Sequence, residues 1–476
     1  MRKILFVLVV LIVSAPTALP QASRPANSPT GTPSPAIEPG KLLPDIHCAS
    51  HPEQSYALYL PSSYSPYRRW PLIVSSDPGA QGEIPLELQK AAAERLGYIL
   101  ASSNNSRNGP WKPRLEATQA VLDDLQTRFP IDSRRIYFAG FSGGARFSSQ
   151  LAASCKCSAG LLLSGAGFNQ GLAPDPKAAL PVFSTVGIFD FNYKEVVPFQ
   201  DTLAKAAYPH WLRIFDGSHQ WPPADVMDEA LTWFRIQAMK SQLEPRDQAF
   251  IDAQFAKGRA RAESFEHSGN LLDAQREYSQ IADTFDSLVD AANVASIRAK
   301  AQSLAEEKMV REAAKREQND FKEEYQLASD IVARVLTPPD PGNRFRSDQD
   351  LQSQIVHLRE NAAQEKRPEK LRVDKRALGD VFVTAMETGN SLLDDKKFQN
   401  AARDFDLATQ ALPNSGWTWS QLALAHAAAG DKREALASLR RAYELANDKA
   451  SFRAWLQTEL AFAPLRSSPD FQSLEK

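Results

Sequence analysis

The sequence has few cysteines, no excess of charge of one sign and no apolar run long enough to span a membrane. Its formal net charge is −2, so it lacks the basic excess with which nucleic-acid-binding proteins neutralise phosphates. Only Cys48, Cys155 and Cys157 are present, which allows one internal disulfide at most. No His and Cys residues have the spacing of zinc ligands. The sequence therefore predicts no nucleic-acid partner, no metal and no other cofactor.

The N-terminal residues are typical of a secretory signal. Arg2 and Lys3 precede an apolar run (4–13) that is about half as long as the roughly 20 residues of a membrane-spanning helix, and small residues and prolines follow. We therefore interpret residues 1–22 as a signal peptide of a secreted or periplasmic protein. An uncleaved N-terminal membrane anchor is the alternative. Residues 23–44 are rich in Pro, Ser and Thr and are predicted to be a linker.

Residues 45–242 alternate between short apolar runs and segments with helical spacing of apolar residues. The strand-like runs lie at 56–61, 70–76, 98–103, 135–141, 160–165, 181–189 and 211–217. Runs that are apolar throughout, separated by helices, indicate a mostly parallel sheet that is buried on both faces. We therefore predict an α/β domain with helices on both faces of the sheet.

Strand signals end near Pro245, and helical sequence continues to the C-terminus. We divide it into a helical unit (246–300), a long helical connector (301–375) and a region of repeats (376–476). The repeat signal is a set of small and large apolar residues with a period of about 34 residues. The matching positions are Ala401, Phe405 and Ala408; Ala435, Leu439 and Ala442; and, less completely, Gly269, Ala274, Tyr278 and Ile281. This pattern resembles the tetratricopeptide repeat, which implies an all-α repeat domain that binds a protein partner.

The stretch "GFSGG" (140–144) is the main candidate for a catalytic motif. It fits G-x-S-x-G, and it stands between a predicted strand and a predicted helix. A serine on such a sharp turn has small neighbours, exposes its hydroxyl above the sheet and precedes a backbone N–H that stabilises an oxyanion. We therefore predict Ser142 as nucleophile and the N–H of Gly143 as one oxyanion donor. A tight helix cap without catalytic function is the alternative for Ser142.

A serine nucleophile needs a base, and the base needs an acid to orient it. His219 follows the last predicted strand, in "WLRIFDGSHQWPP", and is the predicted base. Asp190 ends the preceding strand, in "PVFSTVGIFDFNY", and gives the expected order of Ser, acid and His. Asp216, on the same loop as His219, is the alternative acid. Asp190 is preferred because the acid is expected to come from a separate strand.

Two further loops follow strands at the same edge of the sheet. "DPGAQG" (77–82) is expected to give the second oxyanion donor, and because proline has no N–H, Gly79 or Ala80 must supply it. A carboxylate at Asp77 would oppose a developing oxyanion unless it is turned away. "SNNSRNGPW" (103–111) carries candidate substrate contacts, with a simple polar turn as the alternative. These candidates are Asn105, Arg107, Asn108 and Trp111.

These motifs together resemble the α/β-hydrolase family. Residues 45–242 are most similar to secreted esterases of the polyhydroxyalkanoate-depolymerase and feruloyl-esterase type and to the related carboxylesterase and phospholipase-like group. The resemblance rests on "YALYLPSSY", "GFSGGA", Asp190 and "DGSHQWP". It implies a Ser-His-Asp hydrolase that cleaves a small ester or an ester polymer through an acyl-enzyme. A serine peptidase, and a non-catalytic scaffold whose repeats recruit an envelope protein, are the alternatives.

Overall fold

The structure is a computed structural model that describes residues 37–178, 180–337, 344–446 and 448–475. The predicted signal peptide and most of the predicted linker lie outside these residues. The fold below is that of residues 39–476, which form one compact unit. Among the helices of the described residues, none has the length and apolar character required to cross a membrane.

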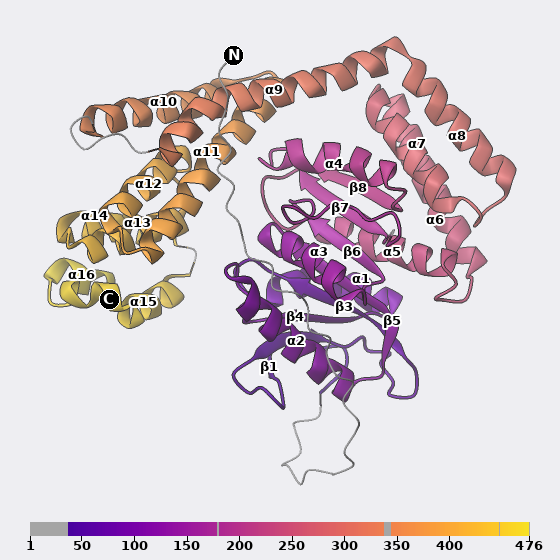
Figure 1. Cartoon of the computed structure of the whole chain (residues 1–476), viewed down its shortest axis with the longest axis horizontal. Helices are drawn as coiled ribbons and strands as arrows, with labels where there is room; N and C mark the ends of the chain where they lie inside the picture. Colours follow the sequence, from indigo (N-terminus) through magenta and orange to yellow (C-terminus); the bar gives the residue numbers. More distant parts are fainter. Residues whose placement is uncertain (1–36, 179, 338–343, 447, 476) are drawn as a thin grey trace, which may run out of the picture. The chain divides into compact units, whose positions relative to one another are not determined.

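An eight-stranded, mostly parallel sheet forms the N-terminal region, in the order β1-β2-β4-β3-β5-β6-β7-β8 (Figure 1). The strands are β1 (Leu42–His47), β2 (Ser55–Tyr59), β3 (Trp70–Ser76), β4 (Ile99–Ser103), β5 (Ile131–Phe141), β6 (Gly160–Ser164), β7 (Val182–Gly187) and β8 (His210–Phe215). Strand β2 is antiparallel to β1 and β4, and the other neighbours are parallel. Every residue of β2, β3, β4, β6 and β7 is buried, so both faces of the sheet are covered. The predicted mostly parallel sheet is confirmed.

Strand β1 was not among the predicted strands, and it begins inside the segment that the sequence predicts to be linker. Leu42 and Leu43 pair with Tyr59 and Leu58, and the register then shifts before Ile46. Pro44 lies at this irregularity and removes one backbone donor, which an edge strand tolerates. A proline within six residues hides the alternation that marks a strand, so the sequence alone favoured a linker.

Five helices belong to the sheet region: α1 (Glu83–Leu96), α2 (Trp111–Arg128), α3 (Gly143–Cys155), α4 (Tyr193–Lys205) and α5 (Ala224–Lys240). Alternate residues of β5, Tyr137 and Ala139, form a cluster with Leu86 of α1 and Phe234 of α5. Helix α3 packs against β5 and β6 and carries Ser142 at its N-terminus. This arrangement places the predicted nucleophile between the central strand and the helix that covers it.

The C-terminal half is helical. Its elements are α6 (Gln248–His267), α7 (Leu271–Phe285), α8 (Ala291–Glu306), α9 (Lys308–Leu336), α10 (Arg344–Gln364), α11 (Pro368–Asp394), α12 (Phe398–Ala411), α13 (Gly416–Ala429), α14 (Lys432–Leu445), α15 (Lys449–Thr458), the 3-10 helix η1 (Leu460–Leu465) and α16 (Pro469–Glu475). The small and large apolar residues of the predicted repeats are buried within α7, α12 and α14, except for Gly269, which is exposed and precedes α7. Their burial fits close helix packing, and the assignment to a repeat family stays a prediction.

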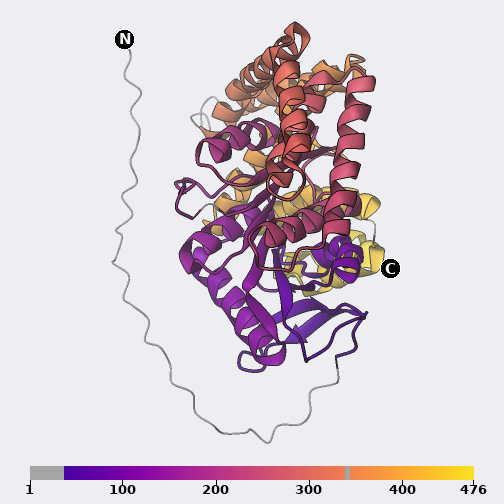
Figure 2. The same cartoon turned by 90° about the vertical axis from the view of Figure 1, so that its right-hand side faces the viewer.

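Helices α6 to α8 share a hydrophobic core with the sheet region. Figures 1 and 2 show the backbone of these helices beside the sheet region. Trp211 of β8 and Trp233 of α5 belong to the same buried cluster as Ile281 and Phe285 of α7. The Trp233 indole N–H donates to Thr284 Oγ1 at 3.0 Å. The predicted boundary at residues 242–246 is therefore a change of secondary structure and not a break between two cores.

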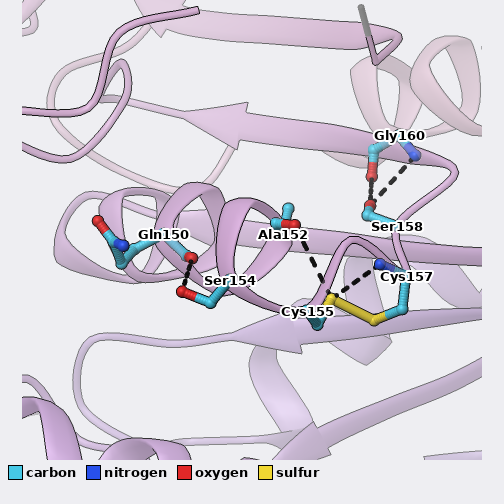
Figure 3. The surroundings of a disulfide bond; sticks show 7 residues. All are labelled: Gln150, Ala152, Ser154, Cys155, Cys157, Ser158 and Gly160. Carbon is cyan, nitrogen blue, oxygen red and sulfur yellow. Dashed lines mark hydrogen bonds between the residues drawn. A yellow bond between two sulfur atoms is a disulfide. The ribbon is translucent and has the colours of Figure 1, made fainter. Parts of the chain in front are cut away.

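A disulfide closes the C-terminal end of α3 (Figure 3). It joins Cys155 to Cys157, and the residue between them, Lys156, caps the helix with a left-handed φ of 53°. Cys48 is the remaining thiol, and it is buried. The three cysteines thus form one disulfide and one free thiol, which is the most that the sequence allows.

Native protein should react very slowly with Ellman's reagent at pH 8. Burial, and secondarily the charge of Asp124, raises the pKa of the Cys48 thiol to about 11, because an apolar environment disfavours the thiolate. At pH 8 such a thiol is ionised about one part in a thousand, and the thiolate is the reacting form. One thiol per chain should react when the protein is unfolded in guanidinium. Rapid reaction of the native protein would contradict this assignment.

Candidate active site

Ser142 lies on a sharp turn between β5 and α3. Its φ of 52° and ψ of −122° belong to a strained region for a residue with a side chain. A Cβ on Gly140 would lie 2.3 Å from the carbonyl of Gly144, and a Cβ on Gly144 would lie 1.9 Å from the carbonyl oxygen of Ser76. The two glycines of the motif are therefore required by close backbone contacts. The Ser142 N–H donates to the Ser164 carbonyl at 2.8 Å, which fixes the turn against β6.

The three predicted residues of a triad are joined by hydrogen bonds. His219 Nε2 lies 2.8 Å from Ser142 Oγ, and His219 Nδ1 lies 2.9 Å from Asp190 Oδ1. Asp190 is fully buried, whereas the His219 side chain is 20% exposed. A carboxylate only accepts hydrogen bonds, so Nδ1 carries the proton and Nε2 is left to accept from the serine hydroxyl. This is the arrangement in which a histidine removes a proton from a serine.

Asp190, and not Asp216, contacts the histidine. The Asn192 N–H donates to Asp190 Oδ1 at 2.8 Å, and the Asn192 side chain donates to the Gly165 carbonyl at 2.7 Å. These bonds hold the carboxylate at the end of β7. Asp216 is exposed, and no hydrogen bond joins it to another described residue.

Aromatic rings hold the imidazole of His219 on two sides. The ring centroid of Phe141 lies 4.6 Å from that of His219, and the centroid of Phe191 lies 4.2 Å away. Trp221 packs on Phe141 at 5.6 Å. These aromatic residues were not among the predicted site residues, although each stands within two positions of a motif residue. Their positions restrict rotation of the imidazole between serine and aspartate.

The carboxylate of Asp77 is turned into its own loop and toward Trp221. Asp77 Oδ1 accepts hydrogen bonds from the Gly79 N–H at 2.8 Å and the Gln81 N–H at 3.1 Å. Asp77 Oδ2 accepts from the Trp221 indole at 2.8 Å, and the Ala80 N–H donates to the Asp77 carbonyl at 3.0 Å. In this conformation the N–H groups of Gly79 and Ala80 are both engaged. Neither is available as the second oxyanion donor that the sequence predicts.

The predicted substrate-contact residues are spread over different environments. Asn105 is engaged with β2, because its Oδ1 accepts from the Ser55 N–H at 2.8 Å. Trp111 begins α2 and packs on Phe147 of α3 with centroids 5.0 Å apart, and Arg107 is exposed. Asn108 alone touches the nucleophile turn, because a Cβ on Gly143 would lie 2.3 Å from Asn108 Nδ2.

A cavity of about 1460 Å³ lies apart from the triad. It is lined by residues of β8, α4, α7, α9 and α11 and includes none of the triad residues. Its charged walls are internally paired, as Arg276 is with Glu317 and Arg213 with Glu277. We place the candidate site at Ser142 because the hydrogen-bonded triad, and not cavity size, indicates chemistry. No cluster of His, Cys, Asp and Glu within the described ranges could hold a metal ion.

Comparison with known proteins gives matches to solved structures only. No protein-family model and no curated protein matches the chain. The chain is similar to a hyperthermophilic esterase from the archaeon Pyrobaculum calidifontis, at 12% identity and a TM-score of 0.34, covering 42% of this chain and 87% of that one. It is also similar to the fluorophosphonate-binding serine hydrolase F of Staphylococcus aureus, at 16% identity and a TM-score of 0.33, covering 41% of this chain and 98% of that one. It is similar as well to the feruloyl esterase module from Clostridium thermocellum, at 14% identity and a TM-score of 0.33, covering 42% of this chain and 89% of that one.

Proposed function

We propose that this protein is a serine hydrolase that cleaves a carboxylic ester through an acyl-enzyme. The observation that carries the proposal is the continuous hydrogen-bonded chain from Ser142 through His219 to Asp190 at a strained strand-to-helix turn. Ser142 Oγ attacks the carbonyl carbon while His219 Nε2 takes the hydroxyl proton. Asp190 keeps the imidazole in the required tautomer and stabilises its cationic form.

The tetrahedral oxyanion forms at the N-terminus of α3. The Gly143 N–H points to no acceptor among the described residues, and the positive end of the helix dipole lies at the same place. His219 then returns the proton to the leaving alcohol as the carbon–oxygen bond breaks. Water, deprotonated by the same histidine, attacks the acyl-enzyme and releases the acid and Ser142.

We also propose a location and a role for the flanking regions. The predicted signal peptide directs the protein to a secreted or periplasmic location, with membrane attachment only if that segment is retained. The helices of 376–476 offer a surface for a protein partner, as the resemblance to tetratricopeptide repeats implies. The same triad would also serve a serine peptidase, so the leaving group must be tested directly.

A fluorophosphonate probe tests the proposed function. The full-length protein should be labelled at one serine and should hydrolyse p-nitrophenyl esters, because the probe reacts with activated serines. Ser142→Ala should lose the label and reduce kcat by at least about 10³-fold. The matched control is Ser154→Ala, which changes an exposed serine on the same helix and should leave labelling intact.

Three outcomes would contradict the proposal in different ways. No labelling of the wild-type protein would favour the scaffold alternative. Equal labelling after Ser142→Ala would place the reactive serine elsewhere. Faster hydrolysis of peptide p-nitroanilides than of any p-nitrophenyl ester would replace esterase by peptidase.

A further inference from the structure

We infer that the side-chain amide of Asn108 is the second oxyanion donor of this site. The inference rests on the proposed function, because it assigns a role in the same reaction. An oxyanion in a hydrolase is usually held by two or more donors, and the Gly143 N–H supplies one. A second donor must therefore lie near the Gly143 N–H.

The loop that follows β3 does not offer a free donor. Pro78 has no N–H, and the N–H groups of Gly79 and Ala80 donate to the carboxylate and the carbonyl of Asp77. The Asp77 carboxylate is itself fixed by Trp221. Releasing either N–H would break a hydrogen bond at a residue that is 5% exposed, which makes rearrangement of the loop during the reaction costly.

Asn108 lies between the loop that follows β3 and Gly143. Its backbone N–H donates to the Pro78 carbonyl at 2.9 Å, which ties the segment after β4 to the segment after β3. Its side chain lies against Gly143, since a Cβ there would be 2.3 Å from Nδ2, 2.5 Å from Oδ1 and 2.6 Å from Cγ. The whole amide therefore occupies the space beside the residue that gives the first donor.

Unlike the side-chain amides of Asn104 and Asn105, that of Asn108 forms no hydrogen bond within the described residues. Asn104 Nδ2 donates to the Pro44 carbonyl, and Asn105 Oδ1 accepts from Ser55. For Asn108, no hydrogen bond joins the side chain to any residue in the described part of the chain. A rotation of 180° exchanges Oδ1 and Nδ2, so a negative oxygen would select the orientation in which the NH₂ group faces it.

The position of the Asn108 amide explains why residue 143 is glycine. Any side chain at position 143 would displace the Asn108 amide, whereas the turn itself is already satisfied by Gly140 and Gly144. The Arg114 guanidinium donates to the Gly143 carbonyl at 3.2 Å and holds that peptide in place. Two donors on separate segments, one backbone and one side chain, thus converge beside Ser142.

Asn108→Ala tests the inference in the full-length protein. A donor used only in the transition state lowers kcat when it is removed and leaves KM nearly unchanged. We expect kcat for the best p-nitrophenyl ester to fall by about 10²–10³-fold. The Ki of a trifluoromethyl ketone, whose adduct with serine carries an oxyanion, should rise by a similar factor. Asn108→Asp should be at least as slow, because it replaces the donor with a negative charge.

The control is Lys112→Ala, an exposed residue on the same segment whose ion pair is with Glu116. Its kcat and thermal midpoint should equal those of the wild type, and the thermal midpoint of Asn108→Ala should be unchanged because Asn108 is exposed. A kcat for Asn108→Ala within threefold of the wild type, or a change in KM alone, would overturn the inference while Ser142→Ala still abolishes turnover. Turnover that survives Ser142→Ala would overturn the proposed function itself.

Discussion

Asp190→Asn should lower kcat for ester hydrolysis by about 10⁴-fold, the size that the same exchange has in a Ser-His-Asp protease, with little loss of fold. The carboxylate accepts from both His219 Nδ1 and the Asn192 N–H through one oxygen. An asparagine keeps the shape of the side chain but carries no charge to stabilise the imidazolium. It can also present NH₂ to Nδ1, which forces the proton onto Nε2 and prevents that atom from accepting the serine proton.

The matched variant is Asp216→Asn, which removes the other carboxylate that the sequence offers as the acid. Asp216 is exposed and has no contact with the imidazole, so its kcat should stay within threefold of the wild type. Single-turnover kinetics with circular dichroism as a check on folding would measure both variants. The reverse pattern, a slow Asp216 variant and an active Asp190 variant, would move the acid to the histidine loop.

The three residues of the proposed triad can be selected from the sequence because each one carries a local signal. Ser142 is marked by its glycines, and Asp190 and His219 are marked by their places after strands. Parallel strands end at one edge of a sheet, so positions after such strands meet in space. In the structure, His219 lies within hydrogen-bond distance of both Ser142 and Asp190.

Features that depend on side chains from distant segments were not predictable in this way. The pairing of Asp77 with Trp221 joins positions that are 144 residues apart, and no local pattern signals it. The sequence showed that Pro78 lacks an N–H, but not that the Asp77 carboxylate would occupy the N–H of Gly79. The sequence did not predict strand β1 because it contains Pro44. A proline indicates the end of a strand unless the strand is known to lie at an edge of the sheet.

The helical half contacts the sheet region, and the sequence gives no prediction about this contact. Lys194 of α4 forms ion pairs with Glu324 of α9 and with Asp380 of α11, and Arg376 of α11 pairs with the same glutamate at 2.9 Å. Glu324 is fully buried, so these charges need each other. Charged helical sequence predicts a solvated surface, and only the folded chain shows that these residues face α4.

Helix α11 also reaches the surroundings of the histidine. A Cβ on Gly379 would lie 3.0 Å from Phe191 Cβ, and Phe191 packs on the imidazole of His219. The ring that restricts the histidine is therefore supported from behind by the helical half. This contact connects the predicted repeat region with the surroundings of His219.

Removal of residues 246–476 should leave a sheet region that does not fold stably. Truncation exposes Trp211 and Trp233. It also removes Glu277, so that Arg213 keeps only its ion pair with Glu229. Each large apolar side chain returned to water costs about 1.5–3 kcal/mol. Domains are stable by only about 5–15 kcal/mol, so the loss of two such side chains is a large part of the total. The truncated protein should therefore show no cooperative thermal transition and no fluorophosphonate labelling.

A less extensive truncation and a point variant separate the shared core from the rest of the helical half. A chain that ends at Glu306 keeps α6 to α8 and should fold, with kcat lowered because Phe191 loses its support from Gly379. Ile281→Asp in the full-length protein buries a charge in the shared core and should lower the thermal midpoint. The exposed site Ser268→Asp should not. Cooperative melting and probe labelling of a chain of residues 1–245 would contradict this prediction. They would show that the sheet region folds without the helices, whose role would then be to bind a partner.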